Sequence, residues 1–211
     1  MTAPIRVAVL ISGGGSNMLA LAASPGPAAR VTLVISNRPG APGLDRARAQ
    51  GIEALAIDHR PYGADRAAHE AAIHAELVAH DIELVCLAGY MRLLTPWFVS
   101  AWAGRMLNIH PSLLPAYPGL HTHARALAAG ARLHGCTVHW VTETMDEGPI
   151  LGQAAIAVMP DDTAETLAAR VLVQEHRLYP AVLASVTSAE ARAPDPAAAL
   201  LNPLPAVTSH L

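Results

Sequence analysis

The sequence predicts an α/β protein with a doubly wound, mostly parallel sheet and an appended antiparallel hairpin. Up to His110, short apolar runs rich in β-branched residues alternate with segments of helical character, which is typical of successive βαβ units. Beyond Gly130, two β-like runs follow each other with only a turn-forming acidic loop between them. That second pattern indicates a hairpin rather than another crossover unit.

Composition indicates one ordinary globular domain. The chain has 211 residues, of which 52 % are hydrophobic and 15 % charged, so it can bury a substantial core. We expect a single domain over residues 1–188 and a C-terminal tail over 189–211, where the sequence becomes Ala/Pro-rich and aperiodic. Cys86 and Cys136 adjoin apolar runs, which favours small core residues of a cytosolic protein over a disulfide.

Charge and hydropathy exclude several classes of partner. The net charge of −3 gives no general attraction to nucleic acid or to anionic membranes. The apolar runs are too short to span a membrane, and the N-terminus lacks a signal-peptide pattern. We therefore expect a cytoplasmic monomer or homodimer that acts on small molecules. All 14 basic residues are arginine, which excludes a Walker-type phosphate loop and a Schiff base on a protein lysine.

The elements of the first half follow from local patterns. Residues 65–80 have apolar positions at helical spacing, and Pro96 suits the first position of another helix. The fifth strand ends at His110 because the prolines that follow cannot continue it. The predicted strands of this half are 5–11, 31–36, 53–57, 84–88 and 105–110, and its other helices are 18–23 and 43–50.

The second half is expected to hold the hairpin and a long helix. The hairpin consists of strands 137–142 and 150–158 around the loop 143–149, and a short helix over 124–129 precedes it. Asp162 and Thr163 suit the N-cap of a helix over 164–178, which we expect Pro180 to interrupt.

The turn after the first strand is suited to a phosphate. Residues 12–17 read Ser-Gly-Gly-Gly-Ser-Asn between a strand and a helix, a Rossmann-like arrangement in which backbone N–H groups converge. The dinucleotide fingerprint is not met, because Met18 stands where its third glycine belongs and Asn37 where a ribose-binding acid belongs. The loop therefore favours a monophosphate over NAD, with a tight turn that binds nothing as the alternative.

Asn108 and His110 form the most informative pair. Residues two apart on a strand point to the same face, and this strand ends where open α/β sheets bind ligands. The pair places a hydrogen-bond donor beside a proton carrier. Taken alone, it favours a buried polar pair that caps a strand.

Five motifs in order resemble the phosphoribosylglycinamide formyltransferases, folate-dependent enzymes of purine biosynthesis. The resemblance covers about residues 5–185, and one departure is Gly14, where such enzymes often carry Asn. The motifs are Ser-Gly-Gly-Gly-Ser-Asn (12–17), Met-Arg-Leu-Leu (91–94), Asn-Ile-His-Pro-Ser-Leu-Leu-Pro (108–115), Tyr-Pro-Gly-Leu-His (117–121) and Asp-Glu-Gly-Pro (146–149).

The resemblance implies a formyl transfer from 10-formyltetrahydrofolate, as co-substrate, to the amine of glycinamide ribonucleotide. Asn108 and a protonated His110 would stabilise the oxyanion, and His110 would move the proton. Asp146 would orient the imidazole, with simple turn chemistry as the alternative. No metal is implied, and His121 and His123 lie in a Pro/Gly loop with no Cys or acid at ligand spacing.

The resemblance also assigns the two substrate subsites. Gly15, Ser16 and Asn17 would bind the ribonucleotide phosphate, and Glu175 would lie near its sugar unless it is a helix-surface acid. His139 resembles a family position, as either a hydrogen-bonded or a catalytic residue. The folate pocket would comprise Arg66, Met91, Arg92, Leu93, Leu94, Asn108, Thr142 and Glu143, with a solvated turn charge as the alternative for Arg92.

Three other functions stay open. A formyltetrahydrofolate hydrolase, or another folate-dependent formyltransferase, would use the same Asn108, His110 and Asp146. A non-catalytic nucleotide-binding protein would need the glycine loop but has no reason to bring these three side chains together. Their convergence in space therefore discriminates an enzyme from a binding protein.

Overall fold

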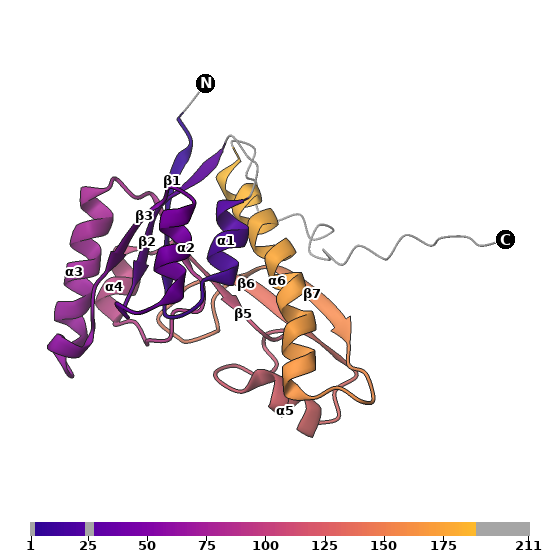
Figure 1. Cartoon of the computed structure of the whole chain (residues 1–211). Coiled ribbons are helices and arrows are strands. Elements are labelled where there is room, and N and C mark those ends of the chain that lie inside the picture. The colour runs from indigo at the N-terminus through magenta and orange to yellow at the C-terminus, as the bar shows by residue number, and fades with distance from the viewer. Residues whose placement is uncertain (1–2, 24–27, 189–211) are drawn as a thin grey trace.

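The computed structural model, which describes residues 3–23 and 28–188, is one seven-stranded sheet with helices on both faces (Figure 1). The strand order is β3-β2-β1-β4-β5-β6-β7. All pairings from β3 to β5 are parallel, whereas β6 is antiparallel to both β5 and β7. The predicted parallel sheet with an appended hairpin is confirmed. The strands are β1 (Ile5–Ile11), β2 (Ala29–Ser36), β3 (Glu53–Ala56), β4 (Leu84–Leu87), β5 (Met106–His110), β6 (Leu133–Trp140) and β7 (Ile150–Ala157).

The helices form two layers, as a doubly wound sheet requires. One face of the sheet is covered by α1, α2 and α6, and the other by α3 and α4 (Figure 1). The helices are α1 (Ser16–Ala22), α2 (Pro42–Ala49), α3 (Arg66–Ala79), α4 (Pro96–Ala101), α5 (Thr122–Ala128) and α6 (Ala164–Thr187), with a 3-10 turn over Arg60–Tyr62.

Strand alternation builds a core on each face. Along β1, Val7 and Val9 belong to the core beneath α1, α2 and α6, whereas Ala8 and Leu10 belong to the core beneath α3 and α4. All four side chains are fully buried. A central strand that is buried on both faces reads as a continuous apolar run, which is why the sequence of β1 shows no polar alternation.

The long C-terminal helix differs from expectation, because Pro180 does not interrupt it. Pro180 cannot donate to the His176 carbonyl, yet α6 continues to Thr187. Beyond the proline, Val182 and Leu183 are 4 % and 3 % exposed. Burial of two such side chains is worth about 3 to 6 kcal/mol, against about 3 kcal/mol for a proline inside a helix. Tertiary packing therefore outweighs the local break.

Smaller differences concern element boundaries. Strand β6 starts at Leu133 rather than 137, because its pairing with β7 already begins at Leu133 and Ala157. Helix α5 starts at Thr122 rather than 124, with His121 as its N-cap. The predicted tail over 189–211 lies outside the described residues. Both cysteines are buried and free, and burial raises the pKa of each thiol to about 12.

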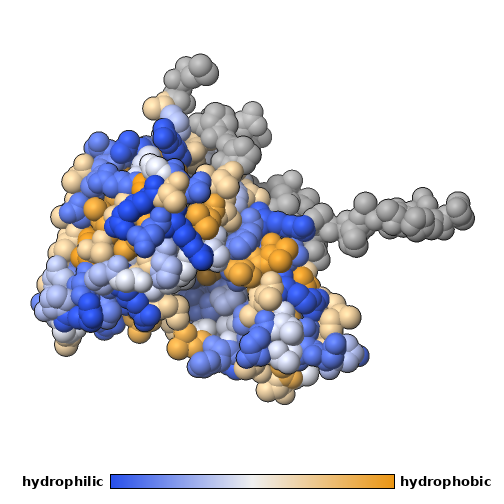
Figure 2. Space-filling view, viewed as in Figure 1, coloured by the Kyte–Doolittle hydropathy of each residue, from blue (hydrophilic) through white to orange (hydrophobic). Residues whose placement is uncertain are grey.

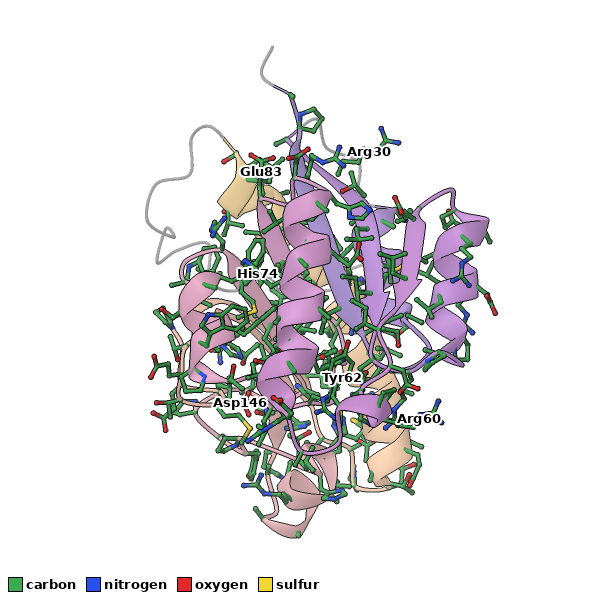
Figure 3. The ribbon with its side chains drawn as sticks, turned by 90° about the vertical axis from the view of Figure 1, so that its left-hand side faces the viewer. Arg30, Arg60, Tyr62, His74, Glu83 and Asp146 are labelled. Atoms are coloured by element: carbon green, nitrogen blue, oxygen red, sulfur yellow. The ribbon has the colours of Figure 1, made fainter. Side chains whose placement is uncertain are left out.

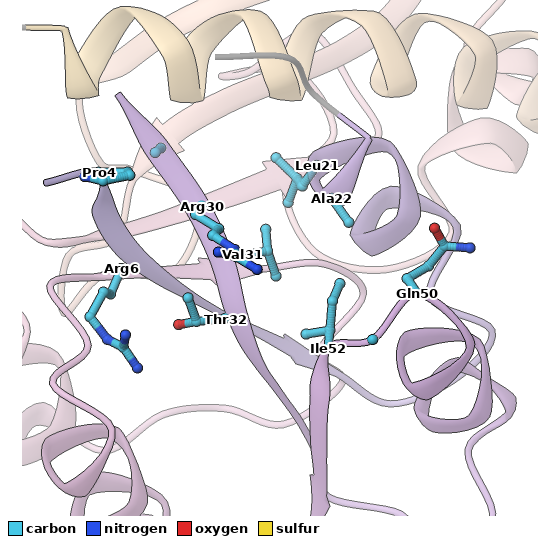
Figure 4. Close-up of a pocket in the computed structure, with 11 residues that line it drawn as sticks. Pro4, Arg6, Leu21, Ala22, Arg30, Val31, Thr32, Gln50 and Ile52 are labelled. Carbon is cyan, nitrogen blue, oxygen red and sulfur yellow. The ribbon is translucent and has the colours of Figure 1, made fainter. Parts of the chain in front are cut away.

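A cavity of about 580 Å³ lies at the amino ends of the first three strands (Figure 4). Its walls include Pro4, Arg30 and Ile52, which directly precede or begin β1, β2 and β3. None of the predicted site residues contributes to it. Among the described residues, no helix combines the length and the apolar character that crossing a bilayer requires.

Candidate active site

The candidate site lies at the opposite edge, at the carboxyl ends of β1, β4 and β5. The strand order reverses between β1 and β4, which is where open α/β sheets bind ligands. In the side view, Asp146 lies near the end marked by Tyr62, far from Glu83 and Arg30 at the amino ends (Figure 3). The surface is hollowed here, between the lobe that holds α2 and α3 and the lobe that holds α5 (Figure 2).

His110 and Asp146 meet at this edge, as the sequence predicts. His110 Nδ1 is 3.5 Å from Asp146 Oδ2, and the two side chains are only 8 % and 7 % exposed. His110 Nε2 is 3.0 Å from the Tyr117 carbonyl oxygen, which can only accept a hydrogen bond. The Gly119 N–H donates to Asp146 Oδ2 at 2.8 Å. Backbone contacts thus fix both the imidazole and the carboxylate.

Asn108 is oriented by His139 from the neighbouring strand. The two residues are cross-strand partners of β5 and β6. His139 Nδ1 lies 2.9 Å from the Trp140 carbonyl oxygen and so carries its proton there. Burial lowers the pKa of His139, although the bond to Trp140 and the charge of Asp146 oppose that shift. The neutral ring leaves Nε2 as an acceptor for the Asn108 amide, 3.2 Å away, and the second amide proton of Asn108 stays available to a ligand.

The glycine loop is held closely by α2. Gly15 is the N-cap of α1 with φ 71°, a conformation that favours glycine. The Gly43 N–H donates to the Gly13 carbonyl at 3.1 Å, and a Cβ on Gly43 would lie 2.4 Å from Ile11 Cδ1. Arg46 Nη1 donates to the Gly14 carbonyl at 3.0 Å. The loop thus has one defined shape, with its carbonyls tied to α2.

Asn17 and Glu175 meet beneath this loop. Asn17 Nδ2 donates to Glu175 Oε2 at 2.6 Å, and both residues are 8 % exposed. Glu175 is therefore not a helix-surface acid. Burial raises the pKa of Glu175, while the bond from Asn17 opposes the rise. Asn17 Oδ1 is buried without a hydrogen-bond partner in the described part of the chain, which leaves polar capacity next to the loop.

The residues predicted to bind folate differ in their exposure. Met91 and Leu93 are 60 % and 59 % exposed, so an apolar strip faces solvent directly after β4. Arg92 is half-buried rather than a fully solvated charge, and its charge acts on His69 and Tyr90. The remaining members of the set are Leu94, which is half-buried, and Arg66, Thr142 and Glu143, which are exposed.

Sequence reasoning missed the backbone contacts of the site. The stretch 117–121 stands out in the sequence as a Pro/Gly loop, but nothing there shows that the Tyr117 carbonyl faces His110 or that Gly119 N–H faces Asp146. Both Tyr117 and Asp146 adopt positive φ, at 55° and 58°. Such turns bring distant main-chain groups to the site without a side-chain signature.

Other histidines lie outside the candidate site. Across residues 3–23 and 28–188, no group of three or more His, Cys, Asp or Glu side chains is arranged to hold a metal ion. His123 Nδ1 instead lies 3.1 Å from His134 Nε2, and the two rings meet edge to face. Burial lowers the pKa of His134 to about 4, and the neighbouring His123 adds to that shift.

Comparison with known proteins agrees with this geometry. A family model described as formyl transferase matches residues 5–183. The phosphoribosylglycinamide formyltransferase of Escherichia coli is 44 % identical over 182 residues, which covers 85 % of each chain. A crystal structure of phosphoribosylglycinamide formyltransferase from Brucella melitensis is 54 % identical, covers 88 % of this chain and 96 % of its own, and superposes with a TM-score of 0.83.

Some relatives are much longer. A trifunctional purine biosynthetic protein, adenosine-3, of Drosophila melanogaster is 48 % identical over 191 residues. The match covers 88 % of this chain but only 14 % of that protein. The same sequence module thus occurs both in chains of this length and within larger proteins. On the extent of the family match and the identity to full-length relatives, the chain belongs to the formyl transferase family.

Proposed function

We propose that this protein transfers the formyl group of 10-formyltetrahydrofolate to the amine of glycinamide ribonucleotide, a step of purine biosynthesis. The observation that carries the proposal is the convergence of Asn108, His110 and Asp146 at the sheet edge that also bears the glycine loop. The similarity to phosphoribosylglycinamide formyltransferases supports the choice of substrates.

The geometry suits direct attack of the substrate amine on the formyl carbon. The attack converts the formyl oxygen into an oxyanion, to which the free Asn108 amide proton would donate. Nε2–H of a protonated His110 would donate as well, when it turns from the Tyr117 carbonyl to the substrate. Asp146 holds the imidazolium in place, and His110 relays the proton that the amine loses toward the departing folate nitrogen. No protein nucleophile is required, and the thiols of Cys86 and Cys136 are buried.

The two substrates would enter from different sides. The phosphate is assigned to Gly15, Ser16 and Asn17, with Glu175 beneath the ribose side of the loop. The pterin is assigned to the apolar strip 91–94, with Thr142 and Glu143 from the hairpin loop and Arg66 toward the glutamate tail. An exposed apolar strip next to main-chain donors and acceptors is suited to a flat heterocycle.

The substrates also define the setting in which the protein works. Both are small charged molecules that need no nucleic acid, membrane or metal ion for this reaction. We accordingly propose a cytoplasmic enzyme that functions as a monomer or homodimer.

An absorbance assay of tetrahydrofolate release tests the proposal. The purified protein receives 10-formyltetrahydrofolate with and without glycinamide ribonucleotide. Release only when the ribonucleotide is present is the expected result. Release at the same rate without it would replace the transferase with a hydrolase, and binding of both compounds without turnover would leave a nucleotide-binding protein.

A further inference from the structure

Ser12 links the two halves of the site through one hydroxyl group. It is the first residue after β1, directly before the glycine loop, and it is 3 % exposed. Its Oγ donates to Asn37 Oδ1 at 2.6 Å, and it accepts the Met91 N–H at 2.8 Å. Since a hydroxyl has a single proton, these two bonds have a fixed direction.

Asn37 fixes Ser12 from the other side. It follows β2, at the position where a dinucleotide-binding protein would carry its ribose-binding acid, and it is 2 % exposed. Its side chain is directed into the protein, toward Ser12 and His59. Two buried side chains, those of Ser12 and Asn37, therefore connect the carboxyl ends of β1 and β2 to the segment after β4.

We propose that Ser12 is a positioning residue that couples the ribonucleotide subsite to the folate subsite. The inference rests on the function proposed above. The Met91 N–H begins the folate strip, and Ser12 begins the phosphate loop, so any shift of the loop is transmitted to the strip through one hydrogen bond. Contacts from the bound ribonucleotide further restrain the loop, and through this hydrogen bond they also restrain the strip, which strengthens folate binding.

The chain offers a matched pair of substitutions. Ser12→Ala removes both bonds and leaves the Met91 N–H without its acceptor. Ser36→Ala makes the same change at a fully buried serine at the end of β2, whose Oγ bonds only to the main chain of Arg38. Both variants lose the hydrogen bonds of a buried hydroxyl group, but only Ser12→Ala removes the link between the two subsites.

Steady-state kinetics then separate positioning from stability. For Ser12→Ala, KM for the formyl-folate should rise about two- to tenfold, the effect of one hydrogen bond, with a smaller change in kcat. For Ser36→Ala, both constants should stay within twofold of wild type. Equal KM values in the two variants would overturn the inference. If Ser12→Ala does not fold, Ser12→Cys replaces it, because a thiol preserves the size and weakens both bonds.

The coupling itself is measured by binding. Tetrahydrofolate, which has no formyl group to transfer, is titrated with and without glycinamide ribonucleotide. In the wild type and in Ser36→Ala, the ribonucleotide should tighten tetrahydrofolate binding, and in Ser12→Ala most of that tightening should be lost. Equal tightening in all three proteins, or none in the wild type, would contradict the coupling. A failure of the proposed function is distinct, because the wild type would then show no transfer at all.

Discussion

The parallel part of the sheet and the antiparallel hairpin contribute different chemistry to the same edge. The glycine loop follows β1 and presents main-chain groups. The strip 91–94 follows β4 and presents apolar side chains. At the boundary between β5 and β6, the edge instead gathers Asn108, His110, His139 and Asp146. The first region is suited to holding substrates, and the second to moving protons and stabilising charge.

This division follows from the change in strand direction. A strand with parallel neighbours on both sides, such as β1 or β4, delivers only its carboxyl end to the edge, so its contribution is the loop that follows. An antiparallel neighbour such as β6 places residues opposite the end of β5, which lets His139 pair with Asn108. The loop between β6 and β7 then places Asp146 next to His110. Substitutions in the two regions should therefore affect different kinetic constants.

The largest effect is expected for His110 and Asp146 at the boundary between β5 and β6. His110→Ala removes the proton carrier, and Asp146→Asn removes the carboxylate that orients it. Each should lower kcat about 10³- to 10⁴-fold, with thermal unfolding close to that of the wild type. Single-turnover rates and circular dichroism melts check both parts. Near-wild-type rates in both variants would contradict the role assigned to the pair.

The next largest effect concerns the oxyanion donor. Asn108→Ala should reduce kcat about 10²- to 10³-fold, because one preorganised donor is lost from a partly buried site. KM for the ribonucleotide should change little, since its phosphate is assigned to a different loop. A comparable rise in KM for the ribonucleotide, with kcat unchanged, would show that Asn108 binds substrate and does not take part in catalysis.

The hairpin should also dominate the response to acid through His134 on β6. Its pKa is about 4 in the folded protein against 6.5 ordinarily. Above pH 6.5 the ring is neutral in both the folded and the unfolded chain, and His134 then does not weaken the fold. As the pH falls from 6.5 toward 4, protonation of the unfolded chain should remove about 3 kcal/mol of unfolding free energy. Urea melts at several pH values should show a shallower pH dependence for His134→Gln. An unchanged slope would refute the assignment.

The smallest effect is expected in the phosphate loop and should appear in KM. Gly15→Ala places a Cβ about 3.0 Å from Met18 Cε and 3.2 Å from Gly43 Cα at φ 71°, so the loop must shift. KM for the ribonucleotide should rise about tenfold, with a smaller rise in KM for the folate, whose strip is reached only through the Ser12 hydrogen bond. Gly51→Ala is the control, because Gly51 has the same φ of 71° but open space around it and lies far from the site. Equal KM changes in the two variants would argue against a phosphate site here.

Much of the fold was predictable from the sequence because local and tertiary preferences agree. Apolar runs such as 5–11 fit a strand by propensity and by burial, and their alternation with helices indicates the parallel sheet. Pro180 shows where agreement fails, since its local preference opposes helix and the packing of Val182 and Leu183 overrides it. Reading the sequence one segment at a time does not reveal this competition between local preference and tertiary packing.

The site was predictable to a lesser extent. Asn108, His110 and Asp146 are brought together as expected, because their motifs sit at strand ends and in the hairpin loop. The proton position on His139 depends on the Trp140 carbonyl, and the link from Ser12 to Met91 joins residues distant in sequence. Hydrogen bonds of this kind depend on the direction of the backbone, which cannot be inferred from the identity of the residues.

The most direct measurement follows the formyl carbon itself. The enzyme, in excess over 10-formyltetrahydrofolate labelled at the formyl carbon, is mixed with glycinamide ribonucleotide, and the products of a single turnover are separated. All of the label should appear on the ribonucleotide amine, with one tetrahydrofolate released for each formyl group transferred. Label recovered as formate instead would contradict direct attack by the substrate amine at this site.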